Sequence, residues 1–174
     1  MKITKPPNEA NYYDKYLDLI TDPDLIAGYK RQSEATLQTL SSLDAGQWNY
    51  RYAEGKWNIK QLVLHLLDTE RVFTYRALRY SRNDKTALPP YDENWYAENC
   101  GDEHRSGASI IEEYAVVRAN TITLFINCTE EMLARTGTAS GLEMSVAKAG
   151  FVILGHEMHH MQVLHERYFP GLGR

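Results

Sequence analysis

Residues 145–168 read SVAKAGFVILGHEMHHMQVLHERY and carry four of the six histidines of the chain. Ser145 is a favourable helix N-cap, and the apolar residues after it recur at helical spacing. His156 and His160 are four residues apart, so a helix places them on one face, about 6 Å apart along its axis. Two imidazoles in this arrangement can bind one metal ion at about 2.0–2.1 Å each.

Three earlier segments also have the apolar periodicity of amphipathic helices, at residues 23–43, 58–82 and 109–125. Each begins with residues that cap helices: Asp22 with Pro23, Asn58 with Gln61, and Ser109 with Glu112. No alternating apolar pattern indicates a β-strand, and no repeat or change of composition divides the chain. Four long helices predict an all-α fold, a four-helix bundle that forms a single domain over residues 1–174.

The connections between these helices differ in length and in composition. Residues 12–20 predict one or two helical turns that pack on the bundle, and residues 129–133 predict another short turn. Residues 83–105 have no sustained period, and a long structureless stretch in a compact domain is often functional. We therefore expect the aromatic residues at 48–57 and 91–96 to line the entrance of a site.

Composition and charge exclude several classes of protein. Hydrophobic residues make up 43% and charged residues 24%, as in an ordinary soluble globular protein. The net charge of −4 leaves no basic excess to neutralise phosphates, which argues against a nucleic-acid binder. No apolar run approaches about 18 residues, so no membrane span is expected. The N-terminus lacks the apolar core of a signal peptide, and the two cysteines stand alone, so we expect a cytoplasmic location.

His65 is the lone histidine of the second predicted helix and falls on its apolar face. In a bundle, it can join His156 and His160 to form a site of three nitrogens with open coordination positions, which is typical of catalytic metals. The alternative is a hydrogen-bonded core histidine. Asp68, three residues after His65, is a candidate to hydrogen-bond that ligand, or else a solvated helix charge.

The string His156-Glu157-Met158-His159-His160 also matches the HExxH motif of zinc proteases, in which the glutamate is the general base. The match ends near the C-terminus, and Val163 and Glu166 stand where the extended motif has glycine and histidine. A protease is therefore disfavoured. The residues alone leave His159 competing with His160 as a ligand, and they assign no role to Glu157 or His165.

Three stretches of the chain resemble the DinB/YfiT-like family of small metal-binding proteins: WNIKQLVLHLLDTE at residues 57–70, LPPYDEN at residues 88–94, and the pairs Gly155-His156 and His159-His160. The resemblance implies a four-helix bundle with His65, His156 and His160 as metal ligands, and it favours His160 over His159. It also implies a divalent transition metal, nickel or zinc, and a homodimer.

The same resemblance implies an enzyme that acts on a small molecule. The first hypothesis is a metal-dependent hydrolase. The alternative is an S-transferase that uses a low-molecular-weight thiol of the bacillithiol or mycothiol type. A third hypothesis, from a different class, is a metal-binding stress protein without catalytic activity. The first two need the same three histidines, so the residues do not distinguish them.

Overall fold

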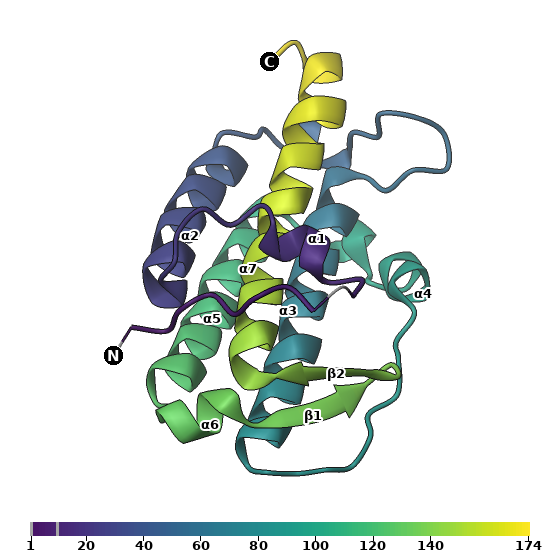
Figure 1. The fold of residues 1–174 in the computed structure, drawn as a ribbon. Helices are drawn as coiled ribbons and strands as arrows, with labels where there is room; N and C mark the ends of the chain where they lie inside the picture. The colour runs from purple at the N-terminus through teal and green to yellow at the C-terminus, as the bar shows by residue number, and fades with distance from the viewer. Residues whose placement is uncertain (1, 10) are drawn as a thin grey trace.

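Four long helices lie side by side and form the body of the molecule (Figure 1). They are α2 (Leu25–Ser41), α3 (Ile59–Ser81), α5 (Gly107–Ile126) and α7 (Val146–Val163). The computed structural model describes residues 2–9 and 11–174. Helix α3 packs on α5 and α7, and α2 packs on the same two helices, so α2 lies diagonal to α3 and α5 lies diagonal to α7. The predicted all-α bundle is confirmed.

Shorter elements cover the sides and one end of the bundle (Figure 1). Helix α1 (Asp14–Leu17) packs on α7, α4 (Glu93–Glu98) packs on α3, and α6 (Glu130–Ala134) packs on α7. The helical turns predicted near residues 12–20 and 129–133 are thus present. Helix α4 lies inside the segment for which the sequence showed no period, because a helix of six residues is too short to establish one.

The prediction that the chain contains no strand is wrong. Strands β1 (Thr136–Ala139) and β2 (Leu142–Ser145) form an antiparallel hairpin in which Ala139 is paired with Leu142. The two turn residues, Ser140 and Gly141, have φ values of 54° and 78°. Positive φ at both positions suits the tight turns of two-residue hairpins. Strands of four residues show too few alternations to stand out in the sequence.

Two helices start at positions other than those predicted. Asp24 caps α2 by accepting a hydrogen bond from the Ala27 N–H (2.9 Å), so Pro23 lies before the helix and not at its first position. Ser106 caps α5 in place of Ser109, whose own N–H it binds at 3.1 Å. The capping box predicted at Asn58 is present at the start of α3.

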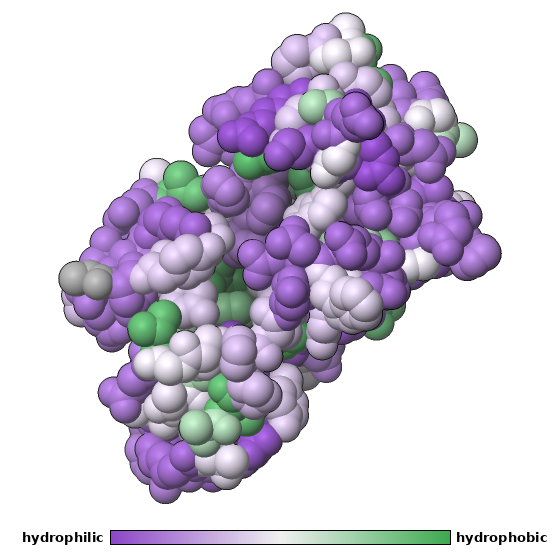
Figure 2. Space-filling model, turned by 90° about the vertical axis from the view of Figure 1, so that its right-hand side faces the viewer, coloured by the Kyte–Doolittle hydropathy of each residue, from purple (hydrophilic) through white to green (hydrophobic). Residues whose placement is uncertain are grey.

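The surface on the α4 side is mostly hydrophilic, with small and separate hydrophobic patches around a hollow (Figure 2). None of the helices in the described ranges has the length and apolar character needed to cross a membrane.

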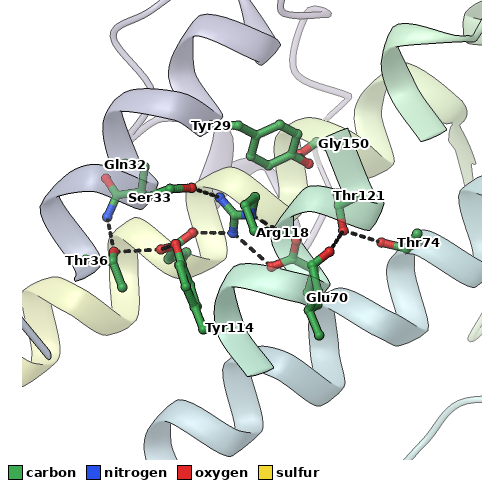
Figure 3. Close-up of polar contacts among 12 residues, drawn as sticks. Tyr29, Gln32, Ser33, Thr36, Glu70, Thr74, Tyr114, Arg118, Thr121 and Gly150 are labelled. Atoms are coloured by element: carbon green, nitrogen blue, oxygen red, sulfur yellow. Dashed lines mark hydrogen bonds and ion pairs between the residues drawn. The ribbon is translucent and has the colours of Figure 1, made fainter. Parts of the chain in front are cut away.

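A buried ion network joins the four long helices at mid-height (Figure 3). Arg118 of α5 donates to both carboxylate oxygens of Glu70 on α3, at 2.9 and 2.8 Å. It also donates to Glu157 Oε2 on α7 and to Ser33 Oγ on α2. The second oxygen of Glu157 accepts from Thr36 (2.6 Å) and Tyr114 (2.5 Å).

The charges of this network stabilise one another away from water. Burial alone would lower the pKa of the Arg118 guanidinium, but the carboxylates of Glu157 and Glu70 raise it well above its usual range. The ring of Tyr29 lies under the guanidinium at 4.6 Å and adds a cation–π contact. Glu157 therefore stabilises the core of the bundle, and both oxygens of its carboxylate already accept hydrogen bonds from protein groups.

We expect Glu157→Gln to lower the free energy of unfolding by about 1–3 kcal/mol, because a buried charged hydrogen bond is replaced by a weaker neutral one. Urea unfolding measures this change. The control is Glu166→Gln, a substitution of an exposed glutamate just after α7. We expect it to change the free energy of unfolding by no more than about 0.5 kcal/mol. Equal stability of the two variants would contradict the role of the network.

Candidate metal centre

Three histidines converge where α3 faces α7. His65 comes from α3, and His156 and His160 come from successive turns of α7, as their spacing predicts. One ring nitrogen from each lies within 4.8 Å of the others, and the Nε2 atoms of His65 and His156 are 3.1 Å apart. Ligand nitrogens at about 2.1 Å from a tetrahedral ion are about 3.4 Å apart, so the cluster has dimensions that fit one ion.

Burial keeps the three imidazoles neutral. It lowers the pKa of His65 to about 4, and burial together with the neighbouring His65 lowers the pKa of His160 to about 3. The pKa of His156 is well below its usual value, again mainly through burial. Neutral imidazole is the form that binds metals.

The donor set fits a metal better than it fits an ordinary hydrogen-bonded core. The Nε2 atoms of His65 and His156 lie 3.1 Å apart, a distance that either one shared proton or one metal ion can bridge. The Nδ1 atoms of His65 and His160 are buried and have no hydrogen-bond partner in the described part of the chain. Buried polar atoms without partners are rare and call for an explanation. One ion can bind one nitrogen from each of the three rings, whereas a shared proton joins only two of them. An ion on the Nε2 side of His65 leaves the Nδ1 atom of that ring without a partner.

Asp68 does not hydrogen-bond to His65, which contradicts its predicted role. Its carboxylate lies 3.7 Å from Arg71, and the residue lines a separate cavity with Trp95 and Cys100 on the α4 side. Burial raises its pKa. The physical reason is helical rotation: three residues turn the side chain by about 300°, which leaves it about 60° away from the direction of His65.

The neighbouring residues of α7 have separate environments. His159 is half-buried, and its ring meets Tyr16 edge-on at 5.8 Å. His165 packs against Phe169 at 4.7 Å, beyond the end of α7. Glu157 points away from the three histidines into the ion network. Among the described residues, the group within metal-binding distance contains His160 and not His159.

The histidine cluster opens into a cavity of about 320 Å³ lined mainly by aromatic and charged side chains. The ring of Trp57 lies beside that of His65, tilted by 47° with the ring centres 4.9 Å apart, and the ring of Tyr16 of α1 meets that of His156 edge-on at 5.3 Å. Gly155 allows this approach of α1, because a Cβ there would lie 2.1 Å from the carbonyl oxygen of Tyr16. The aromatic segments predicted to line an entrance supply Trp57 and Tyr91.

Three further residues that were not predicted as site residues also line the cavity: Tyr16, Thr69 and Arg76. Thr69 Oγ1 lies 2.7 Å from the hydroxyl of Tyr91 and so helps to hold the segment after α3. The helical spacing of the sequence does indicate two of them, Thr69 and Arg76. Thr69 and Arg76 follow His65 by four and eleven residues, and both spacings return to nearly the same helix face.

One relative is similar to this chain in sequence and another in structure, each over most of its length. A protein of Oceanobacillus iheyensis named "putative metal-dependent hydrolase" is 28% identical over 127 residues, which span 71% of this chain and 72% of the relative. YfiT from Bacillus subtilis, described as "a probable metal-dependent hydrolase with an unusual four-helix bundle topology", superposes with a TM-score of 0.69 at 18% identity. That match covers 94% of this chain and 91% of YfiT.

A third relative, a mycothiol-dependent maleylpyruvate isomerase, superposes with a TM-score of 0.64 at 12% identity, over 79% of this chain and 58% of the isomerase. At 18% and 12% sequence identity, these two structural matches establish a shared fold and not a shared function. The sequence profile of the DinB superfamily matches residues 29–164, a range that contains all three clustered histidines. The chain therefore belongs to the DinB superfamily.

Proposed function

We propose that this protein is a metal-dependent hydrolase of a small molecule and that His65, His156 and His160 hold its divalent metal, nickel or zinc. The observation that carries the proposal is the group of three neutral ring nitrogens within 4.8 Å at the wall of a cavity. Three protein ligands leave coordination positions open for a substrate. A homodimer and a cytoplasmic location stay predictions from the sequence.

When bound, the divalent ion would supply Lewis-acid chemistry and a water of lowered pKa. The rings of Trp57 and Tyr16 would narrow the cavity around it and restrict access of bulk water. The hydroxyl pair of Thr69 and Tyr91 offers a polar contact to a bound substrate. Glu157 is not available as the general base of a protease-like mechanism, because both its oxygens are engaged in the core.

We expect His65→Ala and His160→Ala each to abolish stoichiometric metal binding, because two nitrogens do not hold a divalent ion tightly in an open site. His159→Ala is the matched control on the same helix and is expected to retain the metal. Elemental analysis of protein purified without added metal measures the content and identifies the ion. Wild-type protein with less than a tenth of an equivalent, or equal losses in all three variants, would refute this ligand set.

The second candidate function is transfer of a low-molecular-weight thiol. It is supported by the structural likeness to a mycothiol-dependent enzyme and by the same open metal site, because metals deprotonate the thiols that they coordinate.

Activity assays separate the candidates. We expect the metal-loaded protein to hydrolyse at least one member of a panel of small esters and amides, with loss of that activity in His65→Ala. Monochlorobimane and a set of thiols, bacillithiol and mycothiol among them, test the transferase. A metal-dependent bimane reaction without hydrolysis would favour the transferase. No reaction in either assay, with full metal content, would favour a protein that binds metal without turnover.

A further inference from the structure

Arg76 is a buried cation that has no carboxylate partner among the described residues. Its residue exposure is 3%, and it lines the same cavity as the three histidines. Its Nη2 donates to the carbonyl oxygen of Pro89 (3.3 Å) and to Ser140 Oγ (3.2 Å). The remaining N–H groups of the guanidinium make no hydrogen bond within the described chain.

Two other buried cations, Arg118 and Lys148, are paired with carboxylates, whereas Lys60, 7% exposed, donates to the carbonyl oxygen of Asp102. Arg118, also 3% exposed, binds the carboxylates of Glu70 and Glu157. Lys148, 0% exposed, binds those of Glu9 and Asp14 at 2.8 and 2.9 Å. A buried charge without a counter-charge is costly for folding. Among the described cations that are 3% exposed or less, Arg76 is thus the one without a carboxylate partner.

Aromatic rings hold the Arg76 guanidinium without neutralising it. Its Cζ lies 5.0 Å from the ring centre of Phe73 and 6.0 Å from that of Tyr91, and both rings line the cavity. Such cation–π contacts stabilise a cation and leave its N–H edge free to donate. Lys15 adds a second positive charge at the exposed rim of the same cavity, and Glu93 adds one negative charge.

The position of Arg76 sets its distance from the proposed metal site. Eleven residues of helix separate it from His65 on nearly the same face, which corresponds to about 16 Å along the axis. Long side chains of a helix lean toward its N-terminus, so the guanidinium lies closer to the histidines than its Cα does. A ligand that spans the cavity therefore needs a length on the order of 10 Å.

We propose that Arg76 binds the anionic head group, a carboxylate or a phosphate, of an elongated small-molecule substrate whose reactive end faces the three histidines. The assignment of the reactive end rests on the proposed function. The assignment of Arg76 rests on its burial, its free N–H groups and its lack of a counter-charge. Charge-assisted hydrogen bonds to a carboxylate or a phosphate would satisfy the guanidinium that the fold leaves unpaired.

The test compares ligands of equal length and different charge. Octanoate, octyl phosphate and the uncharged octanamide are titrated into the purified protein by isothermal titration calorimetry. Wild-type protein is expected to bind at least one of the anions about ten-fold more tightly than the amide. The ratio between octanoate and octyl phosphate shows which head group the site prefers.

Variants assign that preference to Arg76. Arg76→Gln is expected to lose it and Arg76→Lys to keep part of it. Arg82→Gln, which removes an exposed arginine at the end of the same helix, is expected to keep it in full. An unchanged preference in Arg76→Gln, or no preference in wild-type protein, would overturn the proposal. If circular dichroism shows that Arg76→Gln does not fold, the wild-type and Arg76→Lys comparisons decide.

The His160→Ala variant separates this proposal from the metal proposal. The anion preference is expected to survive in that variant, because the head group binds at Arg76. Its loss there would place the anion at the metal and overturn the role of Arg76. If wild-type protein contains no metal and still prefers the anion, the metal proposal fails and the proposed anion site at Arg76 stands.

Discussion

The ion network around Arg118 is the constraint on which the rest of the bundle depends. Burial of three charges is costly, and the cost is offset only when every group finds its partners. Those partners come from different helices: Glu70 from α3, Glu157 from α7 and Arg118 from α5. The network therefore forms at one relative height and one rotation of the helices, and Ser33 and Thr36 extend the same requirement to α2.

This constraint also positions the histidine cluster. With Glu157 fixed toward Arg118, His156 lies about 100° and His160 about 60° away from it around the helix axis, and both rings face α3. Glu70 lies little more than one turn after His65 on α3, so the same contact sets the height of His65. Glycine at position 155 then lets α1 close over the site with Tyr16. Glu157, the acidic residue of the HExxH string, thus has a structural role in the ion network and lies beside the proposed ligands for that reason.

The cavity at this site is lined by two kinds of buried polar side chain whose hydrogen-bonding atoms are only partly satisfied by the described residues. The neutral histidines leave lone pairs for a cation, and Arg76 leaves N–H groups for an anion. In the neighbouring core, the buried charges of Arg118 and Lys148 are paired with carboxylates. Unpaired groups gathered in one cavity are typical of a site that obtains its missing partners from ligands.

The sequence by itself determined the four long helices and the faces of the histidines, because apolar periodicity, capping residues and i, i+4 spacing are local properties of the chain. The DinB resemblance favoured His160 over His159 as a ligand, which stays a prediction; the ring nitrogens within 4.8 Å of one another belong to His65, His156 and His160. Only the tertiary structure decided the partners of Glu157 and the absence of a carboxylate partner for Arg76 among the described residues. These features depend on which helix faces which, because the residues in contact lie far apart in the sequence: Arg118 is 48 positions from Glu70 and 39 from Glu157.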